Sequence, residues 1–301
     1  MEEKKFTTPI LLITFSRPEM VQKVFDVIKK VKPTRLFVSA DAPRDNVPGE
    51  KERCQESRDI IKQVNWACEV KTLFLEKNLG SGGGPAAGIN WFFENVEEGI
   101  ILEEDCLPNE SFFYFCAELL EYYRNNEKIM HISGNNFQYG KKRGNASYYF
   151  SEYPHIWGWA SWRSAWKLYD FNCVPPEYSK SDWGKQWLIA VQKQSGLAIL
   201  PNVNLVTNIG IGEGAVHTIE PKHFLNLPLV EIKFPLIHPK SIGKNWFADF
   251  FTYRDIFEGT IKNYIYKYFI KIIKNINLSF KKILILKKNG NTKPNHGIKK
   301  Y

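Results

Sequence analysis

The sequence has few cysteines and no long apolar segment. Its five cysteines are scattered, and none forms a C-x-x-C pair, so neither a disulfide framework nor a zinc site is predicted. No run of about 18 apolar residues, the length that spans a bilayer, occurs. The N-terminal apolar stretch is short and no small-residue cleavage site follows it, unlike a signal peptide. These absences predict a protein of the reducing cytoplasm.

Acidic residues are absent from the C-terminal segment 259–301. That segment contains eleven lysines, whereas the rest of the chain is close to neutral, which argues against nucleic acid as a partner. The lysines recur at spacings of four and seven among Ile, Phe, Tyr and Leu: Lys267, Lys271, Lys274, Lys281 and Lys288. This pattern predicts a basic amphipathic tail helix, peripheral on an anionic membrane surface. The alternative is an ordinary terminal helix with a solvated lysine face, or a partly disordered tail.

Strand-like and helix-like segments alternate through the first half of the chain. Helices are predicted at 18–31, 49–64, 85–96 and 109–126, and strands at 9–16, 34–41, 69–76, 99–102 and 128–137. Such alternation is typical of an α/β fold, a Rossmann-like twisted, mostly parallel sheet with helices on both faces. We expect one domain over 1–258, with a nucleotide-sugar-binding half (1–140) and an acceptor-binding half (141–258), followed by the tail 259–301.

Polar residues follow four of the predicted strands, at the sheet edge where parallel α/β folds bind ligands. They are Arg17, Asp41, the segment 78–84 ("NLGSGGG") and the acidic triplet Glu103, Glu104 and Asp105. Each has an ordinary explanation, such as a surface charge, a turn residue or a linker. Their arrival at one edge predicts a functional site.

The acidic triplet and the glycine-rich segment suggest a chemistry together. Carboxylate oxygens select hard cations such as Mg²⁺ and Mn²⁺, which neutralise a departing diphosphate. Glycines let backbone N–H groups approach phosphate closely at a helix N-terminus. Neither a P-loop nor a strand-borne G-x-G-x-x-G motif is present. A solvated acidic turn remains the alternative for the triplet.

Several stretches together resemble GT-A fold glycosyltransferases. The most similar are the N-acetylglucosaminyltransferase I type and bacterial surface-polysaccharide transferases, some labelled haemolysin-like. The resemblance covers about residues 8–220, in "ITFSRPE", "VSADAPR", "LGSGGGPAAGINWFFE", "ILEEDCLPN", "YPHIWGWASWRSAW" and "PNVNLVTNIGIGEGAVHT". The triplet, E-E-D here, corresponds to the D-x-D region of that family.

The resemblance assigns roles to individual residues. Asp105 would bind Mn²⁺ or Mg²⁺ directly, and Arg17 and Asp41 would contact the nucleotide. The remaining nucleotide-sugar-binding candidates are Asn78, Gly80, Ser81, Gly82, Glu103, Glu104 and His217.

Tryptophans and two acids are the candidates in the second half of the chain. Trp159, Trp162 and Trp166 fall at helical spacing, which is typical of a core-facing stripe. Gly158 suggests instead a bend that displays Trp157 or Trp159 to a sugar, and by resemblance this block borders the acceptor site. The resemblance places the catalytic base at an acid beside a Trp. Asp182 fits, with Glu213 as a substitute, although Asp182 equally suits a helix N-cap.

The sequence thus predicts a metal-dependent enzyme that moves a sugar from a nucleotide diphosphate to a hydroxyl of a glycan or lipid-linked acceptor, with inversion. The first alternative is a sugar-phosphate nucleotidyltransferase, although that class begins with a glycine-rich loop after strand one and "TFSRPEM" has no glycine. The second is a non-catalytic glycan-binding or membrane-active protein, which leaves the four polar segments unexplained.

Overall fold

The computed structural model describes residues 5–173, 182–210, 227–256 and 263. Its contacts divide the chain into two units, 1–249 and 250–301. Within the described ranges, no helix is both long and apolar enough to cross a lipid bilayer. The predicted tail helix, apart from Asn263, lies outside the described residues.

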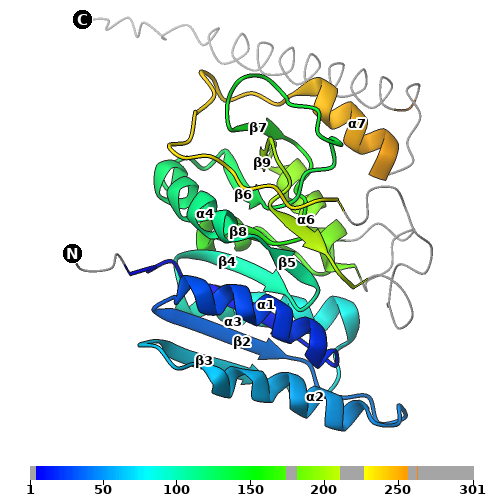
Figure 1. Cartoon of the computed structure of the whole chain (residues 1–301). Coiled ribbons are helices and arrows are strands. Elements are labelled where there is room, and N and C mark those ends of the chain that lie inside the picture. Colours follow the sequence, from blue (N-terminus) through cyan, green and yellow to red (C-terminus); the bar gives the residue numbers. More distant parts are fainter. Residues whose placement is uncertain (1–4, 174–181, 211–226, 257–262, 264–301) are drawn as a thin grey trace, which may run out of the picture. The chain divides into compact units, whose positions relative to one another are not determined.

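The first unit is built on an eight-stranded sheet in the order β3-β2-β1-β4-β8-β6-β9-β7 (Figure 1). The strands β1 to β4 are mutually parallel, and β6 and β9 run in the same direction, whereas β8 and β7 are antiparallel to their neighbours. The strand bounds are β1 Ile10–Thr14, β2 Arg35–Ala40, β3 Glu69–Phe74, β4 Glu98–Glu103, β6 Ile129–Ser133, β7 Tyr148–Ser151, β8 Trp159–Trp162 and β9 Leu197–Pro201. This is the predicted Rossmann-like, mostly parallel α/β arrangement.

Helices cover both faces of this sheet. One face packs against α1 (Pro18–Val31) and α4 (Glu110–Tyr123), and the other against α3 (Gly80–Asn95), α5 (Arg163–Trp166) and α6 (Trp183–Lys193). The remaining described elements are α2 (Glu50–Asp59), a 3₁₀ turn (Ile60–Gln63), α7 (Trp246–Ile256) and a small sheet of β5 (Cys106–Pro108) with β10 (Val206–Asn208).

The central strand β1 shows why the sheet is covered twice. All five of its residues are buried, and successive side chains point to opposite faces. Ile10 and Leu12 enter the core beneath α1 and α4, whereas Leu11 and Ile13 enter the core beneath α3 and α6. An uninterrupted apolar strand is therefore stable only between two helical layers.

Helix α1 begins and ends where its sequence signals lie. Pro18 stands in the first turn, where its missing N–H costs no hydrogen bond. Val21, Val24, Phe25 and Ile28 form one buried stripe at helical spacing. Lys32 ends the helix in the left-handed conformation, and its N–H donates to the carbonyl of Ile28. The short connection from β1 therefore carries Arg17 to the carboxyl edge of the sheet.

Two local expectations are corrected. The glycines of "GSGGG" begin helix α3, which starts at Gly80 and not at Pro85. Trp159 and Trp162 lie at the ends of strand β8, not on a helix with Trp166. All three indoles are buried, so the expected core position holds while the expected helical spacing does not. Three residues of separation on a strand place two side chains on opposite faces, and the two indoles enter different cores.

Candidate functional site

The acidic triplet forms the tight connection between β4 and β5. Glu103 ends β4, Glu104 and Asp105 make the turn, and Cys106 begins β5. The apolar residues Ile100–Leu102 are fully buried between the two cores, which fixes the strand and therefore the position of the turn. Glu104 is 4% exposed and Glu103 and Asp105 are partly exposed, so the middle carboxylate of the turn is withdrawn from solvent.

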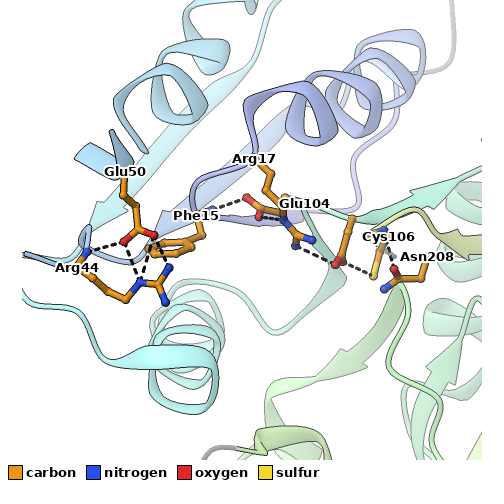
Figure 2. A network of polar contacts seen from close by, with 9 residues as sticks. Phe15, Arg17, Arg44, Glu50, Glu104, Cys106 and Asn208 are labelled. Atoms are coloured by element: carbon orange, nitrogen blue, oxygen red, sulfur yellow. Dashed lines mark hydrogen bonds and ion pairs between the residues drawn. The ribbon is translucent and has the colours of Figure 1, made fainter. Parts of the chain in front are cut away.

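Arg17 bridges two of these carboxylates from the neighbouring strand. Its Nε donates to Glu104 Oε1 at 2.6 Å, and its Nη2 donates to Asp105 Oδ2 at 2.9 Å. The other Glu104 oxygen accepts the backbone N–H of Phe15 at 2.5 Å. Figure 2 shows Arg17 and Phe15 reaching Glu104 from the same segment. Burial lowers the pKa of Arg17, but the charges of Asp105 and Glu104 outweigh it and keep the pKa above its ordinary value.

Glu103 has no hydrogen bond or ion pair to its carboxylate among the described residues. Burial, and then the negative charges of Asp105 and Glu104, raise the pKa of Glu103 to about 8. Burial likewise raises the pKa of Glu104, although Arg17 and the Phe15 amide oppose it. One guanidinium thus faces three carboxylates, and the cluster is short of positive charge.

The shortage of positive charge bears on whether these residues could hold the expected Mg²⁺ or Mn²⁺. A hard cation takes carboxylate oxygens and would relieve the repulsion that raises the pKa of Glu103. Asp105 pairs with Arg17 through Oδ2, while its Oδ1 has, among the described residues, only the Cys106 thiol, at 3.6 Å. The donors fit, and Glu103 and Asp105 are the residues that would hold the ion. Among the described residues, no three His, Cys, Asp or Glu side chains converge as a ready metal site.

The residues just after strand β10, in the second half of the chain, pack against the site. The N–H of Ile209 donates to the backbone carbonyl of Asp105 at 2.8 Å. A Cβ at Gly210 would overlap Asp105 Oδ2 and lie 2.6 Å from Arg17 Nη1. Any larger residue at position 210 therefore requires the Arg17–Asp105 pair to shift. Gly210 was not among the predicted site residues, and its only sequence signal was membership of the stretch "NIGIGEG".

Asp41 lies at the carboxyl end of β2 and caps helix α3. Its carboxylate accepts the N–H of Leu79 at 3.0 Å, of Gly80 at 2.9 Å and of Ala42 at 2.8 Å. Burial raises the pKa of Asp41 and outweighs these hydrogen bonds. The Cβ of any residue at position 84 would lie 2.8 Å from Asp41 Oδ2. Gly84 thus gives the carboxylate room to reach the helix N-terminus.

This cap occupies the start of the glycine-rich segment, whose expected role at phosphate stays a prediction. The N–H of Gly80, one of the residues expected to face phosphate, donates with the N–H of Leu79 to a carboxylate of the chain itself. Asn78 donates to the carbonyl of Ala42 at 2.6 Å, which ties the segment to β2. Ser81 and Gly82 lie in the first turn of α3. A helix N-terminus that already holds an anion is a poor phosphate site, because like charges repel.

The remaining predicted residues lie on the second half of the sheet. Trp157 is partly exposed just before β8, whereas Trp159 is fully buried and stacks on His131. The burial of Trp159 corrects its expected contact with an acceptor. Asp182 is the N-cap of α6 and accepts the Lys185 N–H at 3.0 Å, so the capping alternative is confirmed and the base role stays a prediction. Glu213 and His217 lie outside the described residues.

The similar proteins described next are distant from this chain. No family model and no curated protein sequence matches the chain. A UDP-glucose pyrophosphorylase structure is 8% identical, with a TM-score of 0.41, over 65% of this chain and 90% of that one. The 4-diphosphocytidyl-2C-methyl-D-erythritol synthase of Anaerococcus prevotii DSM 20548 is 9% identical, with a TM-score of 0.37, over 60% and 82%. HddC of Yersinia pseudotuberculosis is 12% identical, with a TM-score of 0.34, over 62% and 100%. Likeness at this level does not assign the site.

Proposed function

We propose that the chain is a glycosyltransferase that binds a nucleotide-diphosphate sugar at the carboxyl ends of β1, β2 and β4. The observation that carries the proposal is the cation-deficient cluster after β4, in which Arg17 pairs Glu104 and Asp105 while Glu103 has no described partner. Such a cluster attracts a divalent cation and, with it, a diphosphate.

The residues take distinct parts in the proposed reaction. Glu103 and Asp105 hold the Mn²⁺ or Mg²⁺ ion, which when bound offsets the charge that develops on the departing diphosphate. Arg17 positions Glu104 and Asp105 through its two hydrogen bonds. Asp41 fixes the start of α3 beside this edge and, as the resemblance implies, contacts the nucleotide. Trp157, the partly exposed indole, is the aromatic surface offered to a sugar.

The general base takes the proton from the attacking acceptor hydroxyl. Asp182 is proposed for this part, with Glu213 as the substitute. Asp182 is 38% exposed at its side chain and has an ion pair with Lys185 at 3.1 Å. Solvent access leaves this carboxylate within reach of an acceptor hydroxyl and lets the proton it takes pass on to water.

Nucleotidyl transfer to a sugar phosphate is the second candidate. It agrees with the names of the similar structures, UDP-glucose pyrophosphorylase and a diphosphocytidyl-methylerythritol synthase. The connection from β1 to α1 opposes it. Only Phe15, Ser16 and Arg17 separate the two elements, and the Phe15 N–H is occupied by Glu104. No glycine-rich phosphate loop fits there.

Product analysis separates the two reactions. Full-length protein with Mn²⁺ is incubated in one series with UDP- and GDP-sugars, and in another with a nucleoside triphosphate and a sugar 1-phosphate. Release of nucleoside diphosphate in the first series supports glycosyl transfer. Release of pyrophosphate in the second supports nucleotidyl transfer. A nucleotide sugar at 100 times its Kd stabilises a protein by about 2.7 kcal/mol, and absence of any thermal shift with all of these compounds would overturn both.

The acceptor and the membrane belong to the same proposal. The segment 259–301, with eleven lysines and no acid, would bring the enzyme to an anionic surface where glycans grow on lipid carriers. Each lysine near such a surface contributes about 1 kcal/mol, and salt screens that attraction. Co-sedimentation with phosphatidylserine vesicles should therefore fall at high salt and on deletion of 259–301. Equal binding to neutral vesicles would exclude this partner.

A further inference from the structure

Two buried asparagines and two buried histidines lie near one another, on β6, just after it, and in the segment before β8. They are Asn135, Asn136, His131 and His155, all at most 5% exposed. One member of each pair is fully hydrogen-bonded and the other is not. That contrast is informative, because buried polar groups in folded proteins nearly always have partners.

Asn136 and His131 are the paired members. Asn136 donates to the carbonyl of Pro201 and accepts the N–H of Gln138 at 2.7 Å. His131 Nδ1 accepts the indole N–H of Trp187 at 3.1 Å, so its Nε2 carries the proton and donates to the carbonyl of His155 at 2.9 Å. Burial lowers the pKa of His131 to about 3 and keeps this ring neutral. Both residues act as structural links.

Asn135 and His155 are the unpaired members. Among the residues that the structure describes, neither the amide oxygen nor the amide nitrogen of Asn135 has a partner, and neither ring nitrogen of His155 meets hydrogen-bond geometry. Burial lowers the pKa of His155 to about 4, although the Asn135 backbone carbonyl nearby opposes the shift. The pair therefore presents two neutral groups, each able to donate and to accept a hydrogen bond.

Aromatic rings complete the cluster. The Phe137 ring lies 4.6 Å from the ring of His155 and 5.0 Å from the indole of Trp157. Trp157 is the partly exposed member of the cluster, and the polar atoms of Asn135 and His155 lie beneath the surface. Neutral donors and acceptors beside aromatic faces match the alternating hydroxyl and C–H surfaces of a sugar ring.

The strand register relates this cluster to the acidic triplet. Ile101 of β4 and Ser133 of β6 both pair with Trp159 of the intervening strand β8. Two strand spacings amount to about 10 Å. Glu103 lies two residues after Ile101, and Asn135 lies two residues after Ser133, at the same edge of the sheet. A sugar attached to a phosphate held at the triplet can bridge such a separation.

We propose that Asn135 and His155 are sugar-binding residues, which hydrogen-bond ring hydroxyls of a saccharide lying between Trp157 and the acidic triplet. The inference rests on the proposed function for the origin of that saccharide and for its position beside the triplet. In glycosyl transfer it is the donor's sugar or the acceptor's, and in nucleotidyl transfer it is the sugar phosphate.

Isosteric apolar variants of the full-length protein test the pair. Titrations with UDP and GDP first identify the nucleotide that binds, and the gain in affinity from nucleoside diphosphate to nucleotide sugar then measures sugar recognition. In Asn135→Leu and His155→Phe this gain should fall about tenfold per lost hydrogen bond, with affinity for the nucleoside diphosphate unchanged. In a second arm, a methyl glycoside is titrated in the presence of nucleotide. Loss in the first arm identifies the donor's sugar, and loss in the second arm identifies the acceptor.

The melting temperature without ligand distinguishes a binding role of Asn135 from a structural one. Asn135→Leu should keep or raise it, because an unpaired buried amide is removed, whereas the matched Asn136→Leu should lower it and keep the affinity gain. Asn135→Asp serves if Asn135→Leu does not fold, and it too should lose the gain. The proposal is overturned if both arms are unchanged in the Asn135 and His155 variants, or if Asn135→Leu melts lower by as much as Asn136→Leu. Failure of every nucleotide to bind would count against the proposed function, while methyl glycoside binding still tests the pair.

Discussion

Arg17 Nη2 lies 2.9 Å from Asp105 Oδ2, although the two residues are 88 positions apart in the sequence. The contact exists because β1 and β4 are parallel neighbours, with Ile13 paired to Glu103 at their carboxyl ends. It ties the segment after the first strand to the segment after the fourth.

Replacing Arg17 by Lys should destabilise the protein by about 3 kcal/mol, because an ammonium cannot bridge both carboxylates and leaves buried Glu104 uncompensated. Chemical denaturation measures this free energy of unfolding. Arg124→Lys is the matched control. Arg124 is 45% exposed and pairs with Glu98 and Glu121, so its loss should stay within about 1 kcal/mol. Equal effects of the two variants would show that the Arg17 bridge has no special role.

Gly210→Ala should displace the Arg17–Asp105 pair, since its Cβ would overlap Asp105 Oδ2. We expect a lower melting temperature and a loss of Mn²⁺-dependent nucleotide binding, both measured by thermal shift. Gly243→Ala adds a Cβ where nothing lies within 4 Å and should leave both values unchanged. Normal nucleotide binding by Gly210→Ala would show that the packing of position 210 against Arg17 and Asp105 is not needed for nucleotide binding.

Asp105→Asn should abolish Mn²⁺-dependent turnover and weaken Mn²⁺ binding while the chain stays folded. The amide keeps an oxygen for Arg17 but loses the charge that a cation requires. Calorimetric titration of Mn²⁺, together with circular dichroism, checks both parts. Asp59→Asn, an exposed change on α2, is the control. Near-normal turnover of Asp105→Asn in Mn²⁺ would remove the metal role of this residue.

Asp182→Asn distinguishes a base from a cap. Asn caps helices about as well as Asp, so the melting temperature should hold, whereas Asp182→Ala should cost about 1 kcal/mol. If Asp182 is the base, Asp182→Asn should lose about a hundredfold or more in turnover with nucleotide binding unchanged. Asn109→Ala, which removes the cap of α4, is the matched control for stability alone. Full turnover of Asp182→Asn would leave Asp182 only a cap.

Asp249 should make the protein less stable as pH rises through neutrality. Burial raises its pKa to about 7, with Glu152 adding to the effect and Ser151 and Lys244 opposing it. The unfolded chain releases this proton at a pH of about 4, whereas the folded state keeps it up to a pH of about 7. The stabilisation is therefore complete below about 4 and is lost as pH rises through about 7. Asp249→Asn should remove that loss. Parallel melting curves from pH 4 to 8 would contradict it.

Local pattern alone predicts much of this fold. Helix α1 occupies Pro18–Val31 as expected, because a proline that suits a first turn and an apolar stripe at helical spacing act within a few residues of each other. The apolar strands and their alternation with helices likewise predict the doubly covered sheet, since such strands are stable only when both faces are buried. The same pattern brings Arg17, Asp41 and the acidic triplet to one edge.

Only the tertiary structure decided which groups at that edge pair with which. The sequence does not give the strand order that sets Arg17 against Asp105 or Asp41 against the start of α3, because strand neighbours are chosen by packing of distant segments. For the same reason Trp159 and Trp162, which suit a helix by spacing, became a strand between β4 and β6. Burial also separates paired Asn136 from unpaired Asn135, since whether a polar group finds a partner depends on residues far away in the chain.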